Sequence, residues 1–321
     1  MTSSSRATFS SRYNPISQKF RFLSGESKKP LIGETIIILA ERRVHHAANA
    51  MWSTRHQQMA QLMDYVVGAS KLLSSPKGIL HLVNNYSGDR MAFEMATEML
   101  DAEGVVVKTL FVDDDVAVQN STYTVGRRGV AGNFFVIKAV GAASENGASL
   151  DELLALGERV NANTRSMGMA LTGCTPPAKG QPIFTLAEDE IEMGVGIHGE
   201  PGRARKKLVS ANEIVDEMLE AILSDRKPTT GDQRADPAFK SGDEVALMVN
   251  GLGGTPISEL YLLYGYAHQQ LEKRGINIWR SYVGEYCTSL EMAGMSITLS
   301  RVDAELKKLY LAPAEVPIRV F

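Results

Sequence analysis

The chain has 321 residues and a formal net charge of −3 at pH 7, with 44% hydrophobic and 22% charged residues. This near-balance of charge gives no reason to expect nucleic acid or a membrane as a partner, and no apolar run approaches the roughly 20 residues of a transmembrane helix. Its two cysteines, Cys174 and Cys287, are too few and too far apart for a disulfide framework or a zinc cluster, which favours a cytoplasmic protein with reduced thiols and no metal site.

Residues 1–30 differ in composition from the rest of the chain. They hold six basic residues, one acidic residue and several serines, so they carry a net charge of +5 and leave −8 for the remainder. This bias fits a variable basic tail, an imperfect gene start or an organelle transit peptide. We expect a variable tail that precedes the folded part of the chain.

Short aliphatic runs alternate with helical patterns along the remainder. Strands are predicted at Thr35–Leu39, Gly78–Val83, Val105–Val112, Ser166–Thr172, Met193–Ile197, Val245–Val249, Ile276–Val283 and Met295–Leu299. Several runs are continuously apolar, as expected for strands covered on both faces. The alternation predicts an α/β fold in which largely parallel or mixed sheets are flanked by helices.

Three helix starts can be read from capping patterns. Ser149 with Glu152, and Ser210 with Glu213, form capping boxes ahead of amphipathic segments. Thr255–Pro256 predicts an N-cap followed by a proline in the first turn of a third helix.

A break in the chain is predicted where glycine, proline and lysine gather, at Gly173–Pro182. It divides the chain into a first α/β domain, residues 31–175, and a second, residues 176–321. A polar stretch at Asp225–Asp243 is interpreted as an exposed loop of the second domain.

The most unusual segment is Met193–Gly202, in which a predicted strand leads to His198 among four glycines and is followed by Glu200 and proline. Glycine permits backbone conformations and close ligand approach that a Cβ would prevent. A neutral imidazole at a strand end can add to a ketone or aldehyde carbon, and the resulting hemiaminal distinguishes carbonyl compounds from polyols. The alternative is a tight turn in which His198 caps a neighbouring carbonyl.

A second segment, Asn84–Arg90, directly follows the predicted strand Gly78–Val83. Ligands of open α/β sheets bind beyond the carboxyl ends of the strands, where this segment lies. Asp89 could accept a proton from a substrate hydroxyl. The alternative role for Asp89 is the N-cap of the following helix.

Two further clusters each allow two interpretations. Asp113–Asp115 could hold a divalent metal or could be solvated, and the ligand spacing does not support a metal. Arg127 and Arg128, between glycines, could bind an anion or an acidic partner, or could be exposed cations of a turn. No glycine-rich segment carries the lysine of a P-loop, which argues against a nucleotide site on this chain.

Taken together, six segments resemble the K subunit of dihydroxyacetone kinases over about three quarters of the chain. They are Asn85–Asp89, Val112–Val116, Gly126–Ala131, Gly194–Gly202, Asn250–Pro256 and Tyr286–Leu290. The resemblance implies a two-domain α/β homodimer that binds dihydroxyacetone or a related short ketose between its domains. It also implies a separate L subunit that holds ADP or ATP and Mg²⁺, in a phosphotransferase-linked system.

The resemblance assigns roles to individual residues. It implies that His198 forms the hemiaminal with the substrate and that Asp89 contacts and helps to activate the hydroxyl that is phosphorylated. The substrate-binding residues that it implies are Asn84, Tyr86, Ser87, Gly88, Gly196 and Gly199.

The chain departs from the family at two positions that bear on phosphoryl transfer. A glycine-rich Ser-Gly-His-Glu-Pro loop is absent after the first predicted strand, where His45 and His46 do not match the motif, and Asn84 replaces a usual lysine. Phosphoryl transfer depends on positioning and charge stabilisation. The departures leave a rival hypothesis, a non-catalytic sugar-binding coactivator that acts on a transcriptional regulator, and a third, an inactive product of a damaged gene.

Overall fold

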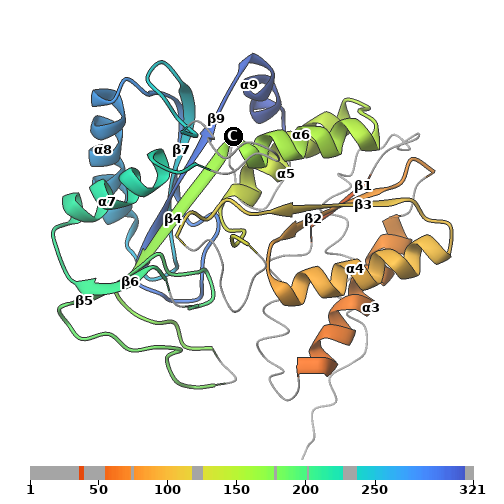
Figure 1. Cartoon of the computed structure of the whole chain (residues 1–321), viewed down its shortest axis with the longest axis horizontal. Helices are drawn as coiled ribbons and strands as arrows, with labels where there is room; N and C mark the ends of the chain where they lie inside the picture. The colour runs from red at the N-terminus through yellow and green to blue at the C-terminus, as the bar shows by residue number, and fades with distance from the viewer. Residues whose placement is uncertain are drawn as a thin grey trace, which may run out of the picture.

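The computed structural model describes residues 36–39, 55–73, 76–117, 126–176, 179–200, 202–226 and 237–314 (Figure 1). The predicted α/β class is confirmed, with two separate sheets and helices on their faces. Within these ranges no helix is both long and apolar enough to cross a bilayer. The predicted tail, residues 1–30, and the segment with His45 and His46 lie outside the described residues.

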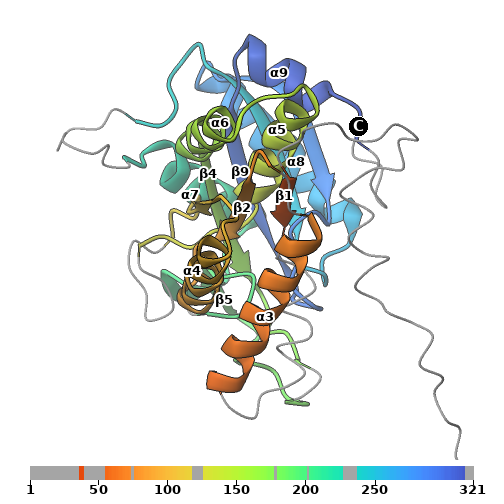
Figure 2. The same ribbon diagram turned by 90° about the vertical axis from the view of Figure 1, so that its right-hand side faces the viewer.

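The smaller sheet is parallel and has the order β1-β2-β3. Its strands are β1 (Ile36–Leu39), β2 (Ile79–Asn84) and β3 (Val107–Val112). Two pairs of helices cover its faces: α3 (Arg55–Leu73) with α4 (Ser87–Ala102), and α5 (Gly132–Glu145) with α6 (Leu150–Ala162). Figures 1 and 2 show one pair on each side of the sheet. Because both faces are covered, β2 is buried along its whole length.

The larger sheet is mixed and has the order β6-β5-β4-β9-β7-β8. Its strands are β4 (Thr164–Ala170), β5 (Glu190–Met193), β6 (Ala204–Lys207), β7 (Glu244–Gly251), β8 (Asn277–Gly284) and β9 (Gly294–Arg301). The helices α7 (Ala211–Leu223) and α8 (Ile257–Lys273) pack on one face, and α9 (Ala304–Leu311) packs with α5 on the other. Strand β7 therefore alternates between two cores: Val245, Leu247 and Val249 face one, and Ala246 and Met248 face the other.

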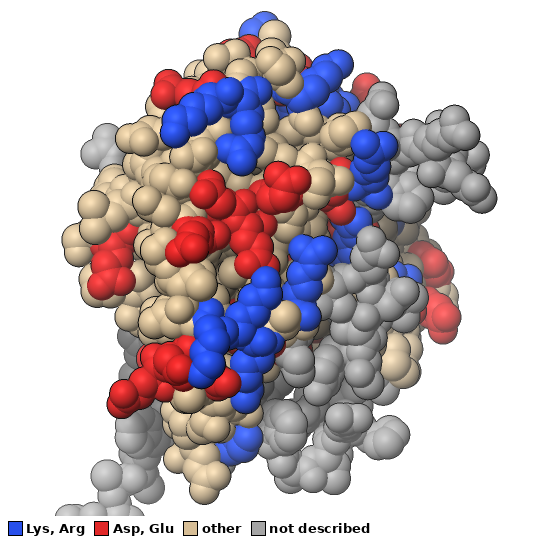
Figure 3. Space-filling view, turned by 60° about the vertical axis from the view of Figure 1, so that its left-hand side comes forward, with Lys and Arg blue, Asp and Glu red and all other residues tan. Residues whose placement is uncertain are grey.

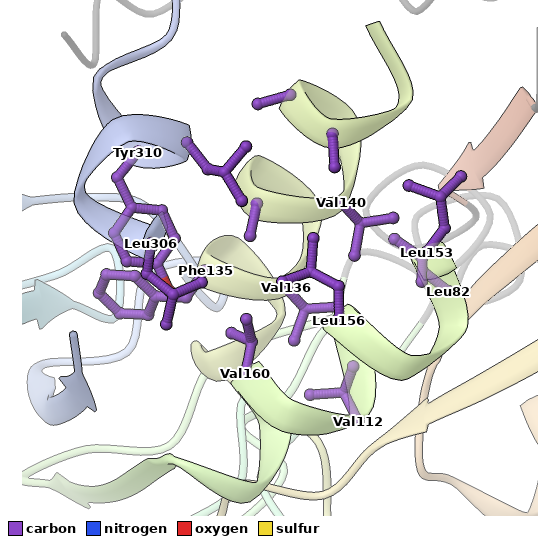
Figure 4. Packing of buried hydrophobic residues seen from close by; sticks show 14 of the residues in the cluster. Leu82, Val112, Phe135, Val136, Val140, Leu153, Leu156, Val160, Leu306 and Tyr310 are labelled. Carbon is purple, nitrogen blue, oxygen red and sulfur yellow. The ribbon is translucent and has the colours of Figure 1, made fainter. Parts of the chain in front are cut away.

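One hydrophobic cluster joins the two sheets (Figure 4). Leu82 and Val112 from the smaller sheet pack with Val136 of α5 and Leu156 of α6, and Tyr310 of α9 belongs to the same cluster. The helices α5 and α6 thus bury apolar side chains from both sheets. This shared core fixes how the strand ends of one sheet approach those of the other.

The capping boxes at Ser149 and Ser210 are confirmed, but the predicted N-cap at Thr255 is wrong. The hydroxyl of Thr255 donates to the carbonyl of Gly294 at 2.7 Å and accepts from its N–H at 2.8 Å. Because β9 engages this hydroxyl, Pro256 takes the N-cap position of α8.

The predicted strand Met193–Ile197 is wrong beyond its first residue. Strand β5 ends at Met193, and Gly194 turns the chain with φ of 80°. The following strand β6, with sequence Ala-Arg-Lys-Lys, is not predicted because it carries charges instead of an apolar run. Charged side chains are typical of edge strands such as β6.

The interpretation of Asp225–Asp243 as an exposed loop is wrong at its beginning, where the side chain of Asp225 is buried. Residues 227–236 lie outside the described part. Strand β4, from the first predicted domain, pairs with β9 in the larger sheet. The predicted boundary near residue 175 stays a prediction.

Candidate functional site

The two segments singled out in the sequence meet between the sheets. Tyr86 follows β2 of the smaller sheet, and His198 follows β5 of the larger sheet. Their rings contact edge to face, with centroids 4.9 Å apart and an interplanar angle of 69°. The shared core therefore places a ring from one sheet against the candidate nucleophile from the other.

A tight turn presents His198. The N–H of Gly199 donates to the carbonyl of Gly196 at 3.2 Å, and Gly199 has φ of 84°. A Cβ on Gly199 would lie 1.5 Å from Cδ1 of Ile183, so both conformation and space require glycine there. The side chain of His198 is 26% exposed, which leaves it within reach of a small ligand.

Glu200 holds His198 through two contacts. Nδ1 of His198 lies 2.8 Å from Oε1 of Glu200, and the His198 backbone N–H donates to Oε2 at 2.8 Å. An ionised carboxylate can only accept, so we assign the proton to Nδ1, which leaves Nε2 with its lone pair. The arrangement contradicts the alternative in which His198 caps a carbonyl through this nitrogen.

Glu200 is kept ionised although it is largely buried. Burial raises the pKa of its carboxyl, but His198 and the guanidinium of Arg128 outweigh that effect and hold the pKa below its usual value. Gly196 provides the space for this approach, since a Cβ there would lie 1.9 Å from Oε2 of Glu200.

Arg128 lies behind this pair and is fully buried. Its guanidinium donates to Oδ2 of Asp115, with Nε at 2.8 Å and Nη2 at 2.7 Å, and Nη2 also donates to the carbonyl of Gly194 at 2.5 Å. The backbone N–H of Asp115 donates to the carbonyl of Arg128 in return, at 3.1 Å. Both sequence interpretations of Arg128, an anion site and an exposed cation, are wrong because the chain supplies its own buried carboxylate.

The neighbouring Arg127 belongs to a different cluster. It forms two hydrogen bonds of 2.7 Å to Asp225, which also accepts from Nε of Arg165 at 2.6 Å. Burial raises the pKa of Asp225, but the two guanidinium groups outweigh it and lower the pKa below its usual value. The interpretations of Arg127 as an exposed cation or as a partner-binding group are wrong for the same reason as for Arg128.

The acidic run after β3 is structural. Asp114 is buried and accepts from the N–H groups of Val130 and Gly132 and from the hydroxyl of Ser166. Burial raises the pKa of Asp114 to about 6. The interpretation of these acids as solvated is therefore wrong for Asp114 and Asp115, and the described part of the chain contains no group of three or more potential metal ligands.

The end of β2 carries the remaining predicted site residues. Asn84 is 1% exposed, and its amide nitrogen and oxygen have no hydrogen-bond partner among the described residues. Ser87, Gly88 and Asp89 form the first turn of α4, whose N-cap is Tyr86. The interpretation of Asp89 as the N-cap is thus wrong. Its buried carboxylate still lies in the first turn, where it interacts favourably with the helix dipole.

Sequence reasoning named Glu200, Arg128 and Asp115 but did not place them in this site. The Glu-Pro pair after His198 offered the only signal, a carboxylate two residues from the histidine. The contacts of Arg128 could not be found from the sequence because they join three separate chain segments.

Charges of both signs are interspersed on the face in Figure 3, where acidic side chains gather between two groups of basic ones. The edge strand β6 shows the same mixing. Its exposed cations Arg205 and Lys206 pair with Glu192 at 3.6 Å and with Glu217 at 2.5 Å. Both cations are exposed, so these pairs contribute little stability and mainly balance the charge of the edge.

Comparison with protein families matches the Dak1 domain over residues 61–318. The chain belongs to the Dak1 family. It is 44% identical over 242 residues to the PTS-dependent dihydroxyacetone kinase 1, dihydroxyacetone-binding subunit DhaK, of Listeria innocua, covering 75% of this chain and 70% of that protein. It is 43% identical over 267 residues to the PEP-dependent dihydroxyacetone kinase, dihydroxyacetone-binding subunit DhaK, of Escherichia coli, covering 79% of this chain and 75% of that protein. The resemblance to the K subunit is confirmed.

Solved structures match the same fold. The dihydroxyacetone kinase operon co-activator Dha-DhaQ has a TM-score of 0.69 and 29% identity, covering 78% of this chain and 74% of that one. The dihydroxyacetone kinase from C. freundii, in complex with AMP-PNP and Mg²⁺, has a TM-score of 0.68 and 28% identity, covering 78% and 44%. A kinase and a coactivator therefore fit this fold equally well.

Proposed function

We propose that this chain is the dihydroxyacetone-binding subunit of a dihydroxyacetone kinase and holds the keto sugar as a covalent adduct on His198. The observation that carries the proposal is the pairing of Nδ1 of His198 with Glu200 beside the ring of Tyr86. Dihydroxyacetone-binding subunits among the relatives, at 40–44% identity, support the substrate class.

The chemistry follows from the position of the proton. The lone pair on Nε2 adds to the carbonyl carbon, so an N–C bond forms and the π electron pair of the carbonyl moves to oxygen, which takes up a proton. Nδ1 gives up its proton through Glu200, which keeps the imidazole neutral. Nothing is expelled, and the net reaction moves one proton from His198 to the new hydroxyl. A polyol offers no carbonyl carbon and is excluded.

The hydroxyl groups of the sugar would be held from the smaller sheet. Asp89 would accept the proton of the hydroxyl that is phosphorylated, with Asn84, Tyr86, Ser87 and Gly88 around the sugar, while Gly196 and Gly199 leave room on the other side. Relatives named as erythrulose kinases, 38% identical, make a four-carbon ketose a second candidate substrate. This chain covers only about 40% of the length of those proteins.

The phosphoryl donor belongs to a partner in this proposal. A separate L subunit would bring ADP or ATP with Mg²⁺ to the trapped sugar, and the K subunit would act as a cytoplasmic homodimer. The role of this chain would then be to capture, orient and deprotonate the substrate.

The first experiment is carbon NMR of carbonyl-labelled dihydroxyacetone mixed with the protein. We expect a new tetrahedral-carbon signal in the wild type that is absent from His198→Ala. His268→Ala is the matched control, because His268 also pairs with a glutamate, Glu272, at 3.5 Å, but on the surface of α8. An adduct that survives His198→Ala, or no adduct in the wild type, would contradict the proposal.

A coactivator that binds the sugar without phosphorylating it is the second candidate. The uncharged Asn84 in place of a lysine favours it, while the structural similarity fits the co-activator and the kinase equally well. Phosphorylation of the trapped sugar with a cognate L subunit and nucleotide would decide for the kinase. An adduct without turnover would decide for the coactivator.

A further inference from the structure

The fully buried Arg128 connects the candidate site to the body of the protein. Its Nη1 lies 2.9 Å from the position that a Cβ on Gly196 would occupy, and Oε2 of Glu200 lies 1.9 Å from the same point. The absence of a Cβ on Gly196 therefore lets the guanidinium and the carboxylate approach the same point. The other nitrogens of Arg128 are fixed by Asp115 and by the carbonyl of Gly194.

The orientation of Arg128 is fixed independently of His198. Its Nε and Nη2 both donate to Asp115, whose Oδ1 accepts from the N–H of Ala117 at 2.9 Å. Asp115 itself bridges to Ser166 of β4, so this anchor belongs to the sheet and not to a loop. A guanidinium held in this way presents its remaining nitrogen at a fixed place.

The titratable groups around this site are Glu200 and Arg128 themselves, together with His198, Asp115 and Tyr86. Arg128 is the permanent cation among them. A protonated Glu200 could donate to Nδ1 of His198, which would move the imidazole proton to Nε2 and remove the lone pair that attacks the carbonyl. The ionised state of Glu200 thus decides which ring nitrogen is nucleophilic.

We propose that Arg128 is a positioning residue that holds Glu200 as a carboxylate against His198 and thereby keeps Nε2 of His198 free to attack the ketone. The role rests on the proposed function, because it concerns the nucleophile of the adduct. Arg128 touches neither substrate nor reacting atoms and acts through Glu200 alone.

The test uses the double variant Asp115→Asn/Arg128→Gln, which removes both buried charges together and so avoids leaving one unpaired. Adduct formation is followed by carbon NMR as a function of pH, and nitrogen NMR of labelled histidine reports which ring nitrogen of His198 carries the proton. Arg127→Gln is the matched control, since the adjacent Arg127 is equally enclosed by its own carboxylate and Asp225 keeps Arg165 as a partner.

We expect the pH of half-maximal adduct formation to rise by about one unit in the double variant. Arg128 is the charge that lies beside Glu200, so its loss outweighs the loss of Asp115 and lets Glu200 take up a proton more easily. We also expect part of the His198 population to carry its proton on Nε2. Arg128→Lys, which keeps a cation, should return the midpoint toward the wild-type value. Arg127→Gln should leave the midpoint and the tautomer unchanged.

A double variant with the wild-type midpoint and tautomer would overturn the role of Arg128, even if less adduct formed, because a purely structural role changes the amount and not the pH midpoint. If the wild type forms no adduct, the proposed function fails separately. The nitrogen NMR of the ligand-free proteins then still decides whether Arg128 controls the tautomer.

Discussion

The adjacent residues Arg127 and Arg128 belong to two different buried ionic clusters, which differ in how exposed their members are. In the first, Arg127 and Arg165 enclose Asp225, and all three side chains are 5–7% exposed. In the second, exposure rises along the cluster, from 0% for Arg128 and 2% for Asp115 to 10% for Glu200 and 26% for His198. The first, the closed cluster, is buried throughout, and in the second, the open cluster, the exposure increases toward His198.

The difference shows what a buried charge can do in each setting. In the closed cluster one buried carboxylate pairs with two guanidinium groups, so we expect its effect to be on the free energy of unfolding. In the open cluster the last member is His198, the proposed nucleophile, so we expect the buried charges to act on the position of its proton. Removing a charge from the closed cluster should therefore change mainly the unfolding free energy. Removing a charge from the open cluster should change mainly the formation of the adduct.

The largest effect on stability is expected from Asp225→Ala, which leaves two buried guanidinium groups without a carboxylate. Removing one partner of a buried ion pair costs about 3–5 kcal/mol of unfolding free energy. Urea unfolding would measure the loss, and adduct formation by the folded fraction should stay within about threefold of the wild type. A large loss of adduct in folded protein would show that the clusters are not independent.

His81 is a buried group that must stay neutral, in contrast to the charged side chains of both clusters. His81 donates from Nε2 to Oγ of Ser70 at 3.0 Å, because the Ser70 hydroxyl already donates to the carbonyl of Val66. Burial lowers the pKa of His81 from 6.5 to about 4. Between these values only the unfolded chain binds the proton, so stability falls as pH falls from 6.5 to 4, by about 3 kcal/mol.

The variant His81→Gln should lack this loss while keeping a donor to Ser70. Asp114 acts in the opposite direction, because its raised pKa, about 6, favours folding as pH falls toward 4. The difference in unfolding free energy between wild type and variant, measured at several pH values, therefore isolates His81. A difference that does not change with pH would show that His81 binds its proton equally well in the folded and unfolded protein, so that its pKa is not lowered by folding.

Glu200→Gln should affect the open cluster alone. A glutamine can accept one hydrogen bond from His198 but carries no charge, and hydrogen bonds to charged groups contribute about 1.5–3 kcal/mol. We expect the affinity for dihydroxyacetone to fall roughly tenfold to a hundredfold, and the unfolding free energy to fall by about 1.5–3 kcal/mol. Titration by carbon NMR checks the first value. Unchanged affinity would remove Glu200 from the mechanism.

The smallest effect is expected at Asn84, which belongs to neither cluster. A buried polar group without a partner costs about 1–3 kcal/mol, so Asn84→Leu should raise the unfolding free energy by about 1 kcal/mol while weakening ligand binding. Asn85→Leu is the control and should destabilise, because Nδ2 of Asn85 donates to the carbonyl of Arg127 at 2.6 Å. Destabilisation by both variants would indicate that a bound water satisfies Asn84.

Much of the fold could be predicted because it depends on local pattern. The largely apolar run of β2, interrupted by His81, predicts a strand buried on both faces. The serine–glutamate spacing at Ser149 and Ser210 predicts helix starts that the structure confirms. Predictions failed where a distant segment competed for a local group. The hydroxyl of Thr255 bonds to Gly294 instead of capping its own helix.

The sequence by itself determined the α/β class, the family resemblance and the two segments that carry Asp89 and His198, because periodicity, capping and glycine spacing are local properties. Only the tertiary structure decided which carboxylate each arginine meets. Arg127 and Arg128 are identical in type and adjacent in the chain, yet one bonds to Asp225 and the other to Asp115. Their partners depend on how the two sheets pack on α5 and α6, and that packing is a property of the whole core.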